Sequence, residues 1–215
     1  MRILYLSFLS LLLSVIALSA AEKPNVIIVL ADDMGIGDMT PSNPDCKIKT
    51  PNLQKMAEEG ILFMDAHSTS AVCTPTRYGL LTGRYNWRSV KARGVLSGTS
   101  PHLIPAERPT IAHMLRKAGY TTAVIGKWHL RSTPTGFDYF DVLIGQGPYY
   151  NPPMKTTNEA GEVITEKNTG YTTDIITDKA LAWLKKDRDS KKPFMLMYQH
   201  KAPHRNWQPG PKYLN

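Results

Sequence analysis

Short apolar runs alternate with amphipathic segments along most of this chain. Residues 25–30 (Asn-Val-Ile-Ile-Val-Leu) form a continuous β-branched run, which predicts a strand buried on both faces. Similar runs predict three more strands, at residues 61–64, 121–126 and 194–198. Proline, glycine and apolar spacing predict helices at residues 50–60, from 74–75 onward, at 109–118 and at 174–186. The alternation indicates an α/β domain with a largely parallel sheet.

Polar and ring-bearing side chains follow three of the predicted strands. Asp32-Asp33 follows the first strand, Lys127-Trp128-His129 follows another, and residues 200–204 follow the last. The carboxyl ends of parallel strands lie at one edge of a sheet, where ligands bind, so we expect these segments to meet there. Residues 133–168, rich in Pro, Gly, Asn and Tyr, are predicted to be long loops over that edge.

The first 21 residues have the layout of a secretory signal peptide. Met1-Arg2 gives a positive start, residues 3–18 are almost entirely apolar, and Ser19-Ala20-Ala21 offers a cleavage site. A membrane anchor is the alternative, but it needs about 20 apolar residues and no small-residue exit. We therefore expect an exported protein with no stable membrane span, whose residues 22–215 belong to one domain. The sequence contains no Asn-x-Ser/Thr sequon, which favours the periplasm or exterior of a bacterium over a lysosome.

Charge and cysteine content narrow the partners. The chain has 215 residues and a net charge of +8, which suits an anionic substrate, although a charge that serves solubility alone is the alternative. Nucleic acid is disfavoured as a partner because there is no basic helix, zinc spacing or stacking-aromatic motif. The two cysteines, Cys46 and Cys73, leave a disulfide open in an exported protein.

Two features of the chain point to chemistry at an anion. The adjacent carboxylates of Asp32 and Asp33 suit a hard cation such as calcium or magnesium, although a solvated turn is an alternative. Cys73 lies just ahead of a predicted helix, whose free N–H groups suit a tetrahedral oxyanion. Arg77, one turn later, can bind oxygens at the same place. The alternative for a lone cysteine is a buried apolar filler.

Residues 73–84 (Cys-Thr-Pro-Thr-Arg-Tyr-Gly-Leu-Leu-Thr-Gly-Arg) resemble the signature of the type I sulfatases, Cys-x-Pro-Ser/Thr-Arg followed by Leu-x-Thr-Gly-Arg. Residues 119–129 resemble the second signature of that family, and Asp32-Asp33 matches its paired calcium ligands. Residues 200–204 (His-Lys-Ala-Pro-His) look like its later histidine segment. The resemblance implies an alkaline-phosphatase-like α/β sandwich with a mostly parallel or mixed central sheet.

The resemblance also implies a mechanism. A formylglycine-generating or sulfatase-maturing enzyme would oxidise Cys73 to formylglycine, whose hydrate attacks sulfur beside a calcium ion held by Asp32, Asp33 and residue 73. His204 would protonate the leaving oxygen, and Lys127 would contact the sulfate. The resemblance further assigns a base to His129, which would help regenerate the aldehyde, and assigns orientation of the diol to Arg77.

Two segments resemble a glycan-directed subgroup of the family. Residues 145–153 and 199–207 are similar to bacterial exo-sulfatases that remove 6-O-sulfate from N-acetylglucosamine in heparan-type glycans or mucins. Aromatic rings can stack on sugars and amides can pair with hydroxyls. The alternative for the first of these segments is a stiff loop that packs on itself.

Family members are longer than this chain. Their second half supplies an Asp-Asn pair for calcium and a lysine for sulfate, and neither is found here. Since calcium takes about six to eight oxygens, we expect this N-terminal portion, alone, to bind calcium poorly and to show little activity. Two other functions remain open: an inactive fragment or non-catalytic sulfoglycan-binding protein, and a related phosphohydrolase of the same superfamily. A phosphohydrolase would use Ser or Thr directly, which Cys73 argues against.

Overall fold

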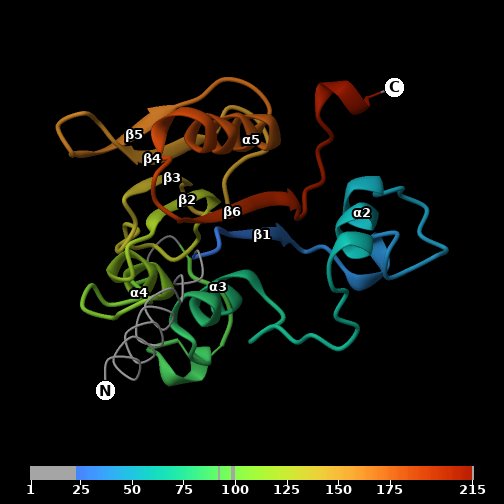
Figure 1. Ribbon diagram of the computed structural model, residues 1–215, viewed down its shortest axis with the longest axis horizontal. Coiled ribbons are helices and arrows are strands. Elements are labelled where there is room, and N and C mark those ends of the chain that lie inside the picture. The colour runs from blue at the N-terminus through green and yellow to red at the C-terminus, as the bar shows by residue number, and fades with distance from the viewer. Residues whose placement is uncertain (1–22, 92, 98–99, 215) are drawn as a thin grey trace, which may run out of the picture.

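The computed structural model describes residues 23–91, 93–97 and 100–214, and the predicted signal peptide lies outside them. These residues form one six-stranded sheet with the order β1-β6-β2-β3-β4-β5 (Figure 1). The strands are β1 (Val26–Asp32), β2 (Thr121–Lys127), β3 (Tyr139–Leu143), β4 (Pro153–Thr157), β5 (Val163–Lys167) and β6 (Phe194–Pro203). The first four strands in that order run parallel, and β4 and β5 are antiparallel additions. The expected α/β fold with a mostly parallel, mixed sheet is confirmed.

Helices cover both faces of this sheet (Figure 1). The α-helices are α2 (Pro51–Glu59), α3 (Cys73–Thr82), α4 (Ile111–Lys117) and α5 (Thr172–Ala182), and α5 continues as a π-helical turn, η3 (Trp183–Asp187). Three short 3₁₀ turns are η1 (Ile36–Asp38), η2 (Asn86–Arg88) and η4 (Pro211–Tyr213). Within the described residues no helix is both long and apolar enough to cross a membrane.

Alternate residues of the central strands feed two separate cores. Val124 and Met197 pack with residues of α3 and α4 on one face of the sheet. Ala123 and Leu196 pack with Ile176 and other residues of α5 on the opposite face. Because successive side chains of a strand point to opposite faces, β2 and β6 are buried on both sides and form the rigid centre of a three-layer sandwich.

β1 is a strand as predicted, but the prediction that both of its faces are buried is wrong. Ile27 and Val29 are 50% and 55% exposed, whereas Val26 and Ile28 pack against the α3–α4 core. β1 lies at the end of the sheet and pairs with β6 alone. An apolar run shows that a segment is suited to burial, but what covers each face depends on distant parts of the chain.

Two other expectations for secondary structure are wrong. Residues 61–64 form no strand, because no described segment pairs with their backbone. All four of their side chains are exposed. Residues 133–168 are not only loops: they contain β3, β4 and β5. The sequence of β5, Val-Ile-Thr-Glu-Lys, does not alternate between apolar and polar residues, so the pattern could not identify it. All of its residues are exposed.

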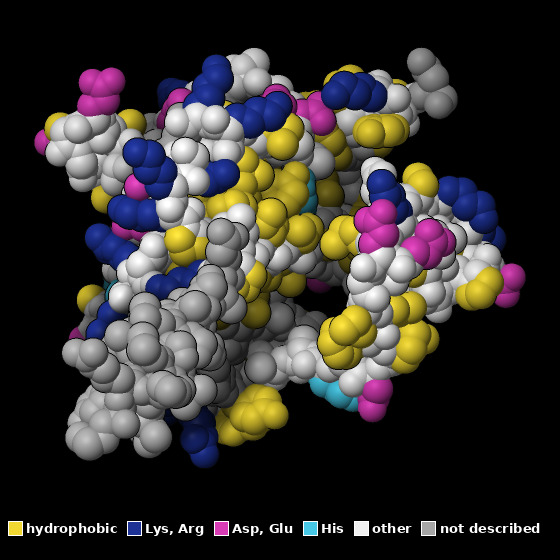
Figure 2. All heavy atoms as spheres, viewed as in Figure 1, with side chains coloured by type: hydrophobic (Ala, Val, Ile, Leu, Met, Phe, Trp, Pro, Cys, Tyr) yellow, Lys and Arg dark blue, Asp and Glu magenta, His cyan; other side chains and the backbone are white. Residues whose placement is uncertain are grey.

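The predicted helices are confirmed, with differences in what they bury. The helix expected at 174–186 is α5 with its π-turn. It buries Ile176, Ala180 and Trp183, whereas Leu181 is exposed. α2 buries none of its residues, and Figure 2 shows hydrophobic side chains exposed on this side of the molecule.

Gly126 lets β2 approach β6 closely. It has φ 108°, and a Cβ there would overlap the carbonyl oxygen of Gln199. Gly161 also has positive φ, 78°, but open space lies around its Cβ position. We predict that Gly126→Ala lowers the free energy of unfolding by about 3 kcal/mol or more, whereas Gly161→Ala costs about 1 kcal/mol of backbone strain. Denaturant unfolding followed by circular dichroism measures both, and equal losses would contradict the close approach.

Candidate active site

The carboxylate of Asp32 is buried between two cations at the carboxyl edge of the sheet. Asp32 ends β1, Lys127 ends β2, and Arg77 lies on α3. The Asp32 Oδ1 accepts from Arg77 Nη2 at 3.3 Å, and its Oδ2 accepts from the Lys127 ammonium. All three side chains are at most 4% exposed. Segments 45 and 95 residues apart in the chain therefore meet at one point.

Arg77 also reaches the neighbouring strand. Its Nη1 donates to the Gln199 side-chain oxygen of β6 at 2.6 Å and to the Lys127 carbonyl at 2.5 Å. Burial lowers the pKa of Arg77 and of Lys127, and the charge and hydrogen bond of Asp32 act against that shift in both. Since two cations face one carboxylate, this edge of the sheet carries an excess of positive charge.

Cys73 faces His129 across the start of α3. Cys73 is the first residue of α3, rather than lying just ahead of it, and its Sγ is 3.2 Å from His129 Nδ1. The neighbouring Thr74 is fully buried, and its hydroxyl donates to the His129 carbonyl at 3.2 Å. The backbone N–H of Leu96 in turn donates to the Thr74 hydroxyl at 3.3 Å. The helix start and the segment after β2 are thus held together, which fixes the cysteine against the imidazole.

His129 is held in a form that accepts protons. Burial, and next the charge of Lys127, lower the pKa of His129 from 6.5 to about 4. Its backbone has φ 51°, so the segment after β2 turns sharply at this residue. A neutral imidazole beside the residue 73 side chain is suited to act as a base.

His204 lies on the other side of the site, just beyond β6. Its Nε2 is 3.7 Å from Asp33 Oδ2, and its Nδ1 is 2.5 Å from the Arg205 carbonyl oxygen. The Tyr149 hydroxyl donates to the His204 carbonyl and fixes the backbone there. Asp33 has φ 68°, and its side chain is 53% exposed. His204 therefore has an acceptor near each ring nitrogen.

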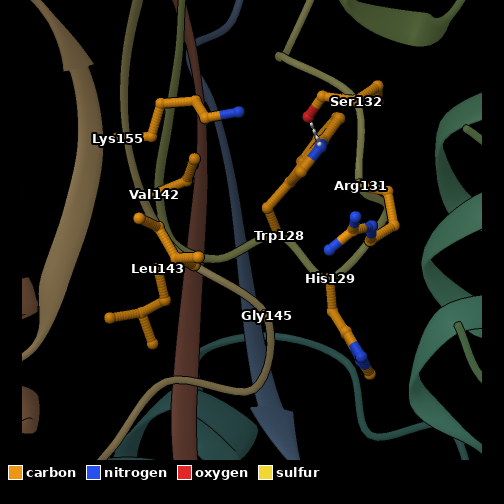
Figure 3. Close-up of a pocket in the computed structure, with 9 residues that line it drawn as sticks. Trp128, His129, Arg131, Ser132, Val142, Leu143, Gly145 and Lys155 are labelled. Carbon is orange, nitrogen blue, oxygen red and sulfur yellow. Dashed lines mark hydrogen bonds between the residues drawn. The ribbon is translucent and has the colours of Figure 1, made fainter. Parts of the chain in front are cut away.

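Three cavities open around these groups. A cavity of about 240 Å³ is lined by Asp32, Asp33, Cys73 and Arg77. A second, of about 360 Å³, contains His204 and several polar side chains of residues 146–149 and 201–208. A third, of about 180 Å³, lies beside His129 (Figure 3). In Figure 3 Lys155 and Arg131 point into this third cavity, while the His129 ring points away from Lys155.

The described residues fit only part of a metal site. Among them no group of three or more His, Cys, Asp or Glu side chains could hold a metal ion. Asp32 and Asp33 line the same cavity as Cys73, and carboxylate oxygens are the ligands that calcium prefers. Calcium takes about six to eight oxygen ligands, which is more than these two carboxylates supply.

The structure brings the residues predicted for the site to one edge of the sheet, in three contacting groups. Asp32, Arg77 and Lys127 form one, Cys73 and His129 a second, and Asp33 and His204 a third. The alternative of a disulfide is wrong, because both cysteines are free. Sequence reasoning gave Thr74 no role. Tyr149 and Gln199 lie in the two segments that resemble glycan-directed sulfatases, but their contacts with His204 and Arg77 were not predicted.

A nucleophile position at a helix start, buried cations and flanking histidines, all at the edge of a parallel sheet, are typical of hydrolases that act on oxyanion esters. The family model named Sulfatase matches residues 24–215, and the chain belongs to the sulfatase family. Sulfatases generally use calcium and formylglycine.

Relatives of known activity lie within this family. The chain is 41% identical over 196 residues to an N-acetylglucosamine-6-O-sulfatase of Bacteroides thetaiotaomicron, a match that covers 90% of the chain and 33% of that relative. It is 45% identical over 116 residues to an N-acetylgalactosamine-6-O-sulfatase of the same organism, which covers 54% of the chain and 22% of the relative. The chain therefore spans about a third or less of the length of these curated relatives.

A solved structure has a similar fold. It shows a protein in complex with its substrate, D-glucosamine-2-N,6-O-disulfate, and matches with a TM-score of 0.76 and 39% identity. The match covers 89% of this chain and 37% of that one.

Arg77→Met is predicted to destabilise the chain strongly. It leaves the buried Asp32 with one cation and leaves the Gln199 oxygen without its donor, so the free energy of unfolding should fall by about 3–5 kcal/mol. Arg116→Met is the matched control, because Arg116 pairs with Asp138 at 2.9 Å across an exposed surface. Such a pair contributes less than about 1 kcal/mol. Urea unfolding of both variants checks this, and similar losses would mean that burial of the pair does not matter.

Loss of stability in acid should depend on His200. Burial lowers its pKa from 6.5 to about 4, and its Nδ1 is buried with no hydrogen-bond partner among the described residues. Between these pH values the unfolded state binds a proton that the folded state does not, so this contribution is complete above pH 6.5 and is lost as the pH falls towards 4. We predict that His200→Gln reduces the fall in unfolding free energy over this window by about 2 kcal/mol.

One comparison sharpens the acid measurement. Part of the acid loss should persist in His200→Gln, since His129 titrates with the same sign. Parallel profiles for wild type and His200→Gln would refute the role of His200.

Proposed function

We propose that this chain carries the nucleophile and sulfate-binding part of an enzyme that hydrolyses sulfate monoesters on a sulfated sugar. The reaction consumes water and yields sulfate and the sugar hydroxyl. The contact between Cys73 and His129, beside the buried Arg77 and Lys127 cations, is the observation that supports it most directly. This combination supports a site in which residue 73 would be the nucleophile, His129 the base, and Arg77 and Lys127 the source of positive charge.

Residue 73 needs maturation for this chemistry. Formylglycine, made from Cys73 by a sulfatase-maturing enzyme, would supply a hydrated aldehyde as the nucleophile. Arg77, one turn further along α3, would orient the residue 73 side chain by hydrogen bonding. Lys127 would bind a sulfate oxygen and offset its charge as the ester bond breaks.

The two histidines would move protons on opposite sides of the sulfur. His129, neutral because burial lowers its pKa to about 4, would accept a proton from residue 73. His204, whose Nε2 lies 3.7 Å from Asp33 Oδ2, would give a proton to the leaving oxygen.

Calcium would be held by Asp32, Asp33 and residue 73, with further oxygens needed to complete its shell. The cation would neutralise sulfate charge during attack. Asp32 already pairs with Arg77 and Lys127, so it would have to share its carboxylate oxygens between these two cations and the calcium ion.

The substrate we infer is 6-O-sulfated N-acetylglucosamine of a heparan-type glycan or mucin. The relative of 41% identity acts on this sugar sulfate, and the solved neighbour binds a glucosamine disulfate. The cavity beside His204 is lined by amide and phenol groups that pair with sugar hydroxyls, namely Gln146, Tyr149, Asn206 and Gln208. We also propose export to the periplasm or the cell exterior, where such glycans are met, on the basis of residues 1–21.

Mass spectrometry of residue 73 tests this function. In protein isolated from its native host, we predict an aldehyde in the tryptic peptide that contains residue 73, and a rate on a sulfated aryl ester that falls by at least about 1000-fold in Cys73→Ala. Cys46→Ala is the control: Cys46 is buried, its thiol contacts only the Ile48 carbonyl among the described residues, and activity should remain. A thiol that stays unmodified, with binding but no hydrolysis of sulfated sugar, would support a non-catalytic sulfoglycan-binding protein.

A further inference from the structure

Lys201 is a buried residue whose ammonium has no hydrogen-bond or ion-pair partner in the part of the chain that the structure describes. It lies on β6 and is 5% exposed. Among the described residues its ammonium makes no hydrogen bond or ion pair, and its one specific contact is with the face of the Tyr149 ring, 4.7 Å from the centroid. The other deeply buried lysine, Lys127, is paired with Asp32. Lys201 is therefore exceptional among the described lysines.

An ammonium on a mostly buried side chain loses part of its hydration, and this is costly when no anion compensates for the loss. The ammonium of Lys201 keeps access to the cavity that the residue lines. Burial, and next the charge of Lys127, lower the pKa of Lys201, whereas Asp32 and Asp33 act in the opposite direction. The aromatic face of Tyr149 offsets only part of the cost. A protein keeps such a group most readily where an anionic ligand completes it.

The position of Lys201 separates it from the nucleophile. Lys201 lines the cavity of about 360 Å³ that contains His204, while Cys73 and Arg77 line a different cavity. No acidic residue lines the Lys201 cavity, and Arg205 adds a second positive charge to its wall. An anion bound by Lys201 would therefore lie in the cavity beside His204, where the leaving sugar would bind.

The size of this cavity limits the ligand. Ligand cavities span about 300–1000 Å³, so this one, near the lower end, suits a single sugar unit. We propose that Lys201, supported by the Tyr149 ring, binds a second sulfate group carried by the same sugar whose ester is cleaved. This inference rests on the proposed function and adds a preference for doubly sulfated sugars.

Calorimetric binding of two sugars to this chain tests the subsite. The probes are N-acetylglucosamine 6-sulfate, with one sulfate, and glucosamine 2-N,6-O-disulfate, with two. Wild type should bind the disulfate about tenfold more tightly, the gain from one charge-assisted contact. Lys201→Met should remove that preference and leave binding of the monosulfate within about twofold, while Lys201→Arg should keep part of it.

Lys155→Met is the matched control. Lys155 also has no ion-pair partner among the described residues, but it lines the cavity on the far side of His129 (Figure 3). It should change binding of neither sugar. Thermal unfolding gives a second readout: Lys201→Met should melt at the same or a higher temperature than wild type, since it removes an unpaired buried charge. A lower melting temperature would show a structural role and contradict the proposal.

The contradicting outcomes in the binding experiment differ from one another. Equal weakening of both sugars in Lys201→Met would place Lys201 on the cleaved sulfate and overturn the second subsite alone. An unchanged preference for the disulfate would overturn it as well. Wild type that binds neither sugar would contradict the sulfated-sugar function itself, and the subsite with it.

Discussion

The carboxylate of Asp32, buried between the Arg77 and Lys127 side chains, is the interaction on which this structure depends most. It joins β1, α3 and β2, and through the Arg77 contact with Gln199 it also reaches β6. Away from water these charges interact strongly, and removing any one leaves the others uncompensated. Because two cations share one carboxylate, the same arrangement that holds the elements together leaves positive charge for an anion.

The scaffold around this network is rigid for a simple geometric reason. β2 and β6 are covered on both faces, and they approach closely at Gly126, so the residues that follow them have little freedom. Thr74 fixes the segment that carries His129 against the start of α3. The side chain of Cys73 therefore faces an imidazole whose pKa is lowered by burial.

Positive charge extends from the network towards the cavity beside His204. Lys201 is buried next to that cavity, and Arg205 lies on its wall. Part of the net charge of +8 is therefore concentrated at the candidate site, where it can attract an anion as well as aid solubility. A sugar with one sulfate beside residue 73 and a second negative charge would be attracted by Arg77 and Lys127 at the first group and by Lys201 and Arg205 at the second.

The sequence by itself determined the central strands and the helices, and it predicted residues that the structure brings to one edge of the sheet. The runs at 121–126 and 194–198 are apolar enough to be buried wherever they lie, and the string at 73–84 places Cys73 and Arg77 by local spacing alone. Only the tertiary structure decided that Ile27 and Val29 are exposed, that residues 61–64 form no strand, and that Lys201 lies unpaired under Tyr149. Burial and pairing depend on which distant segments come together, whereas a strand or helix preference is carried by neighbouring residues.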